Sequence, residues 1–179
     1  MRIIFYLLSI IIANVVTAAF APLQLGMFIV PMGTLLIGST FIFRDLVQNK
    51  YGRAKTYLFI FIALILSGIV SFILGDTVWI VMASAISFVI SETADTEIYT
   101  RLKLPIAWRV LYSGIVGGCL DSVIFVVIGL SPIGANVLPW EAIPAAILGQ
   151  IIVKTVIQMF GALIYNRVRV INRKPLISE

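Results

Sequence analysis

The sequence predicts an all-α polytopic membrane protein, a single bundle of six transmembrane helices over residues 1–179 with both termini in the cytoplasm. Three observations carry this prediction: the composition, the long uncharged runs and the placement of the basic residues. Hydrophobic residues make up 61% of the chain and charged residues 12%, and the mean hydropathy is +1.11. Soluble domains average about 25% charged and about 45–50% apolar residues. A soluble fold of this length could not bury so much apolar surface.

The uncharged runs give the helices in order. A spanning helix needs roughly 20 apolar residues, and the uncharged stretch between Arg2 and Arg44 is about twice that length. It therefore predicts two helices, at about 3–21 and 24–43, with a turn near Pro22. Pro31 is expected to kink the second helix. The later apolar segments predict helices at about 56–75, 77–99, 109–130 and 141–166.

The first segment has an alternative interpretation. Arg2, the apolar run after it and the small-residue ending at Ala19-Phe20-Ala21 imitate a signal peptide with its cleavage site. Cleavage would leave five helices in the same orientation. A retained helix is favoured, because the apolar run is long for a signal peptide and Asn14 lies in its middle.

The basic residues are expected to share one side of the membrane. By the positive-inside rule that side is the cytoplasm, and the opposite side carries only Asp76 and Glu141. The net charge of +5 is then explained by topology, and no nucleic-acid partner is expected. The residues assigned to the cytoplasmic side are Arg2, Arg44, Lys50, Arg53, Lys55, Arg101, Lys103, Arg109, Arg167, Arg169, Arg173 and Lys174.

The segment 43–53 is interpreted as a helix end capped near Gly52, with basic residues at the membrane interface. The alternative is that Asp45 pairs with Arg44 or Arg53 and acts as a gate latch.

Missing residue types exclude most catalytic chemistry. The chain has one cysteine, Cys119, and no histidine. This excludes a disulfide framework, cysteine or histidine metal sites, and Ser-His or Cys-His nucleophiles. The acidic residues are too scattered for an obvious metal site. We therefore expect no enzyme activity, no catalytic residues, no metal and no cofactor.

Two ionisable residues fall inside predicted spans. Asp121 lies about half-way along the fifth predicted helix and Lys154 about half-way along the sixth. Each costs at least ~2.5–3.5 kcal/mol near the membrane centre. They form either an ion pair that locks the two helices or a polar site near the midplane, and intramembrane ionisable residues favour the functional interpretation.

Further polar residues lie at helical spacing and predict a polar cavity. Gln150, Lys154 and Gln158 recur every four residues, so they stack on one helix face. Gly117-Gly118 before Asp121 permit close approach of a helix or a ligand. The other polar steps are Asn14 with Thr17, and Ser84, Ser87, Ser91 and Asp95 with adjoining Glu92.

Several short motifs resemble those of one family. Arg44-Asp45-Leu46 with Tyr51-Gly52, the segment 92–99 leading into Arg101-Leu102-Lys103, Asp121-Ser122 followed by Phe125, and finally Lys154 occur in the right order over nearly the whole chain. Together they are similar to the bacterial queuosine-precursor transporter family, which is also described as vitamin uptake transporters.

The resemblance implies a multi-pass protein of the bacterial inner membrane that imports 7-cyano- or 7-aminomethyl-7-deazaguanine for salvage into tRNA queuosine. A guanine-like edge presents two adjacent N–H donors and a carbonyl acceptor. Asp121 or Glu92 is expected to accept the donors, and Lys154 or Gln150 to donate to the carbonyl. Phe88 or Trp79 is expected to stack on the ring. The candidate substrate-binding residues are Asn14, Phe88, Glu92, Asp95, Asp121, Gln150 and Lys154.

The energy source and the partners stay open. No GxxxxGK[ST] motif is present, so the chain itself does not hydrolyse ATP. It is either a facilitator or secondary carrier, in which Glu92, Asp95 or Asp121 carries a coupling proton, or the substrate-binding subunit of an energy-coupling-factor type vitamin importer. Only the second interpretation requires ATPase subunits as partners. The bilayer is a partner in both, and a homo-oligomer is compatible with both.

Overall fold

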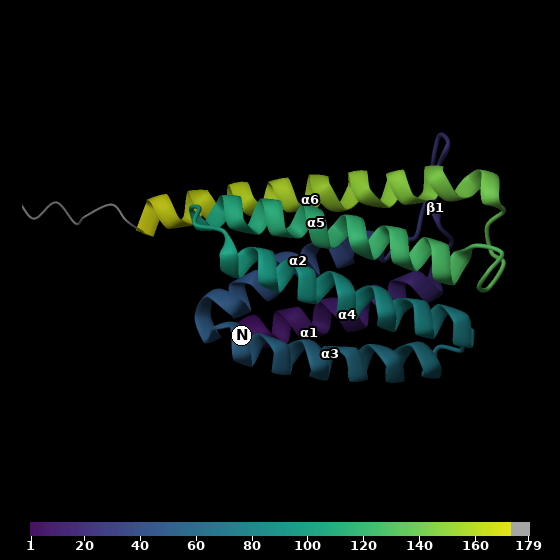
Figure 1. Ribbon diagram of the computed structural model, residues 1–179, viewed down its shortest axis with the longest axis horizontal. Coiled ribbons are helices and arrows are strands. Elements are labelled where there is room, and N and C mark those ends of the chain that lie inside the picture. Colours follow the sequence, from purple (N-terminus) through teal and green to yellow (C-terminus); the bar gives the residue numbers. More distant parts are fainter. Residues whose placement is uncertain (173–179) are drawn as a thin grey trace, which may run out of the picture.

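The computed structural model describes residues 1–172, with side chains as far as Ile164. Figure 1 shows long helices lying side by side along the longest axis of the molecule. The helices are α1 (Arg2–Ala19), α2 (Thr34–Tyr51), α3 (Arg53–Ile73), α4 (Val78–Arg101), α5 (Ile106–Phe125) and α6 (Ile143–Asn172). The hairpin β1 (Leu23–Leu25) and β2 (Phe28–Val30) joins α1 to α2, and a π-helical turn (Val126–Leu130) continues α5.

The helical bundle predicted from the sequence is confirmed. Five of the six helices in the described residues are long and apolar enough to cross a membrane, namely all except α2. The distribution of apolar and polar side chains between surface and interior is the reverse of that in a soluble protein. Large apolar side chains such as Phe61, Phe72 and Leu163 are exposed, whereas among the residues with described side chains 21 polar or charged ones and only 16 apolar ones are buried. The bundle therefore presents apolar side chains to lipid and encloses its polar groups.

The prediction of a second helix at 24–43 is wrong for residues 24–33, which are not helical. That stretch forms the antiparallel hairpin, with Leu23 opposite Val30 and the turn at Gly26, whose φ of +62° suits glycine. Pro31 follows β2 and precedes α2, so it does not kink a helix. Proline lacks the N–H that a helix interior requires, which explains why α2 begins only after it.

The helix α2 consequently starts later and continues eight residues beyond the predicted end. It ends at Gly52, as expected, with a φ of +80°. Arg44, Asp45 and Lys50 are therefore helical rather than part of a cytoplasmic loop, and Arg44 and Asp45 are fully buried. α2 has three charged residues in 18 and is the one long helix among the described residues that is not apolar enough to cross a membrane by composition. It is enclosed by contacts with α1, α3, α4, α5 and α6.

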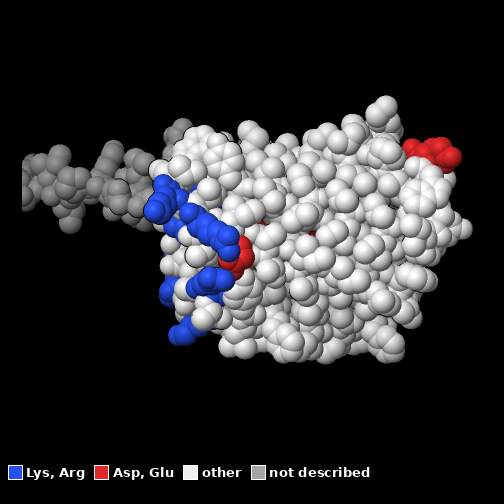
Figure 2. Space-filling model, viewed as in Figure 1, with Lys and Arg blue, Asp and Glu red and all other residues white. Residues whose placement is uncertain are grey.

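Charged residues gather at the two ends of the bundle. Figure 2 shows Lys and Arg at the end where the chain starts and where α6 finishes, and an acidic patch at the opposite end. The positive-inside rule predicts that the basic end is cytoplasmic and that the end carrying Asp76 and Glu141 is outside. Among the described basic residues, Arg44 and Lys154 are exceptions to this segregation, because both are buried inside the bundle. The side chains of Arg167 and Arg169, and all of Arg173 and Lys174, lie outside the described part of the chain.

Candidate functional site

The two ionisable residues predicted at the membrane centre contact each other. Lys154 Nζ on α6 lies 2.7 Å from Asp121 Oδ2 on α5. It also donates to Ser122 Oγ at 2.8 Å and to Gln150 Oε1 at 3.3 Å. Lys154 is 1% exposed and Asp121 8% exposed. Three oxygen acceptors thus satisfy the three donors of a buried ammonium group.

Glycines on α5 make room for these polar side chains. A Cβ on Gly118 would lie 3.5 Å from Lys154 Cβ, which is ordinary contact. A Cβ on Gly114 would lie 2.5 Å from the Gln158 amide, and one on Gly117 would lie 3.1 Å from Asp95 and Phe41. The glycines predicted to allow close approach therefore admit α6 on one side, and α4 and α2 on the other.

An internal cavity of about 320 Å³ lies in the outer half of the bundle, between the Asp121–Lys154 pair and the outer loops. All six helices contribute to its wall, and Asp76 and the hairpin-flanking Pro22 and Pro31 line its outer part. Its polar lining residues are Asn14, Thr17, Thr34, Ser71, Asp76, Ser84, Ser87, Asp121 and Gln150, and its apolar ones include Ile37, Ile80, Phe125 and Leu130.

The inner wall of the cavity carries an acceptor and a donor side by side. Lys154 engages only Oδ2 of Asp121, so the second carboxylate oxygen is left for another donor. Gln150 accepts from Lys154 through Oε1, while its Nε2 is buried and has no hydrogen-bond partner among the described residues. Asn14 Nδ2 is occupied, since it donates to Ser67 Oγ at 2.8 Å. Asp121 and Gln150 are thus the lining groups best suited to a polar ligand edge.

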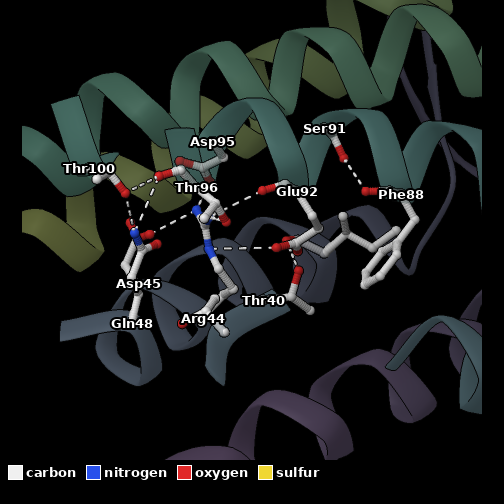
Figure 3. Close-up of polar contacts among 12 residues, drawn as sticks. Thr40, Arg44, Asp45, Gln48, Phe88, Ser91, Glu92, Asp95, Thr96 and Thr100 are labelled. Carbon is white, nitrogen blue, oxygen red and sulfur yellow. Dashed lines mark hydrogen bonds and ion pairs between the residues drawn. The ribbon is translucent and has the colours of Figure 1, made fainter. Parts of the chain in front are cut away.

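A second polar cluster lies closer to the cytoplasmic end (Figure 3). Arg44 on α2 forms ion pairs with Asp45, Glu92 and Asp95. Its Nη2 lies 2.8 Å from Asp45 Oδ1, its Nε lies 3.5 Å from Glu92 Oε2, and its Nη1 donates to Thr96 Oγ1 at 2.5 Å. All four charged residues are at most 1% exposed. We call these four residues the Arg44 cluster.

The structure divides the predicted site residues between the two places. Asn14, Asp121 and Gln150 line the cavity, and Lys154 lies directly behind Asp121. Glu92 and Asp95 do not line it, because they point from α4 toward Arg44.

The two aromatic candidates are also displaced from the cavity. Phe88 packs against the apolar core cluster that contains Tyr6 and Ile10, and Trp79 is 47% exposed on the outer surface of the bundle. The aromatic side chain that does line the cavity is Phe125.

Sequence reasoning missed Arg44 as a buried group because it placed α2 two to three turns too early. A periodic signal was present: Phe41, Arg44, Asp45 and Gln48 follow steps of three and four residues and share a face. Gln48 donates to Thr100 Oγ1 at 2.8 Å, so this face docks on α4. Within the described residues, no group of three His, Cys, Asp or Glu side chains is placed to hold a metal ion.

One family model matches the chain. The family described as "Putative vitamin uptake transporter" matches residues 70–168, more than half of the sequence. The matched range runs from the end of α3 through α6 and includes Glu92, Asp95, Asp121, Gln150 and Lys154. No curated protein and no solved structure matches significantly.

Proposed function

Because the chain belongs to the vitamin uptake transporter family, which includes queuosine precursor transporters, we propose that it imports 7-cyano- or 7-aminomethyl-7-deazaguanine. The membrane would be the bacterial cytoplasmic membrane, with the basic end of the bundle inside. The precursor would then be available for salvage into tRNA queuosine.

The observation that carries this proposal is that Asp121 and Gln150 lie next to each other on one wall of the cavity, where both accept a hydrogen bond from Lys154. A 7-deazaguanine edge offers two adjacent N–H donors beside a carbonyl oxygen. One carboxylate can accept two neighbouring donors, and the unpartnered Gln150 Nε2 can donate to the carbonyl. Lys154 fixes the orientation of the Asp121 carboxyl group through a 2.7 Å contact.

The size and apolar lining of the cavity are consistent with a bicyclic ligand. A volume of about 320 Å³ lies at the lower end of the range of about 300–1,000 Å³ for small-molecule sites. Phe125 and Ile80 line it, and an aromatic face beside a flat heterocycle favours stacking. We therefore assign the stacking role to Phe125 rather than to Phe88 or Trp79.

The direct test is rescue of a strain that cannot make queuosine precursors. The strain receives this gene together with one 7-deazapurine at a time, and queuosine in its tRNA is measured. Queuosine is expected with 7-cyano- or 7-aminomethyl-7-deazaguanine and not with guanine alone. If neither precursor restores queuosine in cells that insert the protein in the membrane, the proposed substrate is wrong.

Matched variants test the role of the cavity wall. Asp121→Asn replaces an acceptor oxygen by a donor and is expected to abolish rescue, and Gln150→Leu removes the donor and is expected to weaken it. The controls are Glu141→Gln at the exposed outer end and Gln24→Leu on the exposed face of β1, which should rescue normally. Normal rescue by Asp121→Asn would show that the substrate binds elsewhere.

A second candidate function follows from the family description, which refers to uptake of vitamins in general. In that case the chain would be the substrate-binding subunit of an energy-coupling-factor type importer and would borrow an ATPase. Uptake would then depend on ATPase subunits, and these would co-purify with the tagged chain. Uptake by the purified chain alone in proteoliposomes would exclude this alternative.

A further inference from the structure

The buried charges of the Arg44 cluster do not balance. Three carboxylates, from Asp45, Glu92 and Asp95, surround one guanidinium group, and each is at most 1% exposed. In the described part of the chain no other Lys or Arg forms an ion pair with these carboxylates. With all three ionised, the interior of the bundle would hold two uncompensated negative charges.

An uncompensated buried carboxylate is strongly unfavourable, and such a group normally takes up a proton instead. A bundle enclosed by lipid makes this argument stronger than it is in a soluble protein. At least one carboxyl group of the cluster is therefore protonated in this conformation.

The geometry singles out Glu92 as the protonated group. Arg44 Nη2 contacts both aspartates, at 2.8 Å for Asp45 and closely for Asp95, whereas the carboxyl group of Glu92 is reached only by Nε at 3.5 Å. Each of the three carboxyl groups keeps an oxygen without a hydrogen-bond partner among the described residues, so the longer contact with Arg44 is what distinguishes Glu92. The fully buried hydroxyl of Tyr6 on α1 lies beside the Glu92 carboxyl group. A tyrosine hydroxyl can donate to a carboxylate or accept from a carboxylic acid, so Tyr6 can partner Glu92 in either protonation state.

The charged surroundings of Glu92 connect it to the cavity. On its cavity side it is within electrostatic reach of Asp121, which is neutralised by Lys154 from α6. On its other side are Arg44 and the two aspartates. On α3, Arg53 and Tyr57 also reach α4, but they contact Glu97 at its cytoplasmic end rather than Glu92. Titratable groups facing the cluster from the packed elements are Tyr6 on α1, Arg44 and Asp45 on α2, Asp95 on α4, and Arg109 and Asp121 on α5.

We propose that Glu92 is a proton-binding site that couples substrate import to inward movement of protons. This inference rests on the proposed function. A proton taken up from the outer side neutralises Glu92 and removes a negative charge near Asp121, the proposed acceptor of the substrate donors. Proton and substrate then bind cooperatively, and release to the cytoplasm returns Glu92 to the carboxylate. No bond of the substrate changes, and the proton gradient supplies the energy.

The main test uses the full chain in proteoliposomes with radiolabelled 7-aminomethyl- or 7-cyano-7-deazaguanine. An imposed gradient, acidic outside, is expected to drive accumulation by the wild type. Glu92→Gln mimics the protonated side chain, so it should retain binding and exchange of substrate across the membrane but lose accumulation. Glu97→Gln is the matched control on the same helix, outside the cluster and 22% exposed, and should accumulate substrate normally.

Binding measured against pH gives a second readout. In the wild type, lowering the pH so that Glu92 becomes protonated should strengthen substrate binding by about 5- to 150-fold, the usual range for coupled sites. The affinity of Glu92→Gln for the substrate should not change over the same pH range. Accumulation by Glu92→Gln equal to that of the wild type, or wild-type accumulation without a gradient, would overturn the proposal.

A substrate-free measurement separates this proposal from the proposed function. Infrared spectra of the purified protein at neutral pH should contain the carbonyl stretch of a protonated carboxylic acid, and Glu92→Gln should lack it while Glu97→Gln keeps it. If this band is present but no deazaguanine is transported, the substrate is wrong and the proton site stands. If the band is absent in the wild type, the proton site is wrong whatever the substrate.

Discussion

Lys154 Nζ lies 2.7 Å from Asp121 Oδ2, across the interface of α5 and α6 and at the inner wall of the cavity. A pair that only locked two helices would not need an open cavity against one partner. Here Lys154 is enclosed, whereas Asp121 lines the cavity and keeps one oxygen away from the ion pair. The lysine therefore orients a carboxylate that is available to a ligand.

Removing Lys154 should destabilise the bundle because it leaves Asp121 buried without its counter-ion. We expect Lys154→Met to lower the free energy of unfolding by about 3–5 kcal/mol, the range for one broken partner of a buried pair. The double variant Asp121→Asn with Lys154→Met should recover much of this loss. Unfolding in detergent micelles measures the stability of the wild type, of Lys154→Met and of the double variant. The control is Lys50→Met, which changes a lysine at an exposed position. Equal stability of the wild type and Lys154→Met would contradict a net stabilising pair.

Arg44 should be more important for stability than the basic residues of the cytoplasmic end. Arg44→Gln leaves the three buried carboxyl groups of the cluster without a cation and is expected to cost at least about 3–5 kcal/mol. Arg53→Gln removes a 54% exposed side chain and is expected to cost about 0–1 kcal/mol. Lower pH should partly restore Arg44→Gln, because its folded state then binds more protons than the unfolded state. A pH-independent defect would argue against this account.

Two glycines on α5 should respond oppositely to alanine. A Cβ on Gly114 would lie 2.5 Å from the buried Gln158 amide, so Gly114→Ala is expected to destabilise by about 1–3 kcal/mol through overpacking. A Cβ on Gly118 meets only ordinary contacts, 3.5 Å or more from Lys154. Gly118→Ala should be neutral, or stabilising by up to about 1 kcal/mol through helix propensity. Thermal unfolding compares the two, and the reverse order would mean that α5 packs differently.

The orientation in the membrane can be checked with single cysteines. Cys119→Ser provides a cysteine-free background, and Lys103→Cys and Glu141→Cys place a thiol at opposite ends of the bundle. A membrane-impermeant thiol reagent added to intact cells should label Glu141→Cys only. Labelling of Lys103→Cys should require opened membranes. The opposite pattern would invert the topology and with it the direction of the proposed import.

The helix boundaries show where local sequence was sufficient. The helices α1, α3 and α4 begin and end within about three residues of their predicted positions, because charged residues and turn residues limit each apolar run. The hairpin at 23–30 was missed because its residues are as apolar as a helix, and composition alone does not separate a short strand from a helix segment. Its turn at Gly26 and the two flanking prolines were the available signals.

By itself the sequence determined the class of protein, the segregation of its charges and the presence of Asp121 and Lys154 inside the membrane. These follow from composition along the chain, since every charge in a lipid-embedded helix carries a cost that depends on its position in the span. Only the tertiary structure decided which polar groups meet: Asp121 and Gln150 at a cavity, and Glu92 and Asp95 around Arg44. The physical reason is that these contacts depend on how far each helix is shifted and rotated against its neighbours. The hairpin sets that shift for α2, and the glycines of α5 set how closely its neighbours approach.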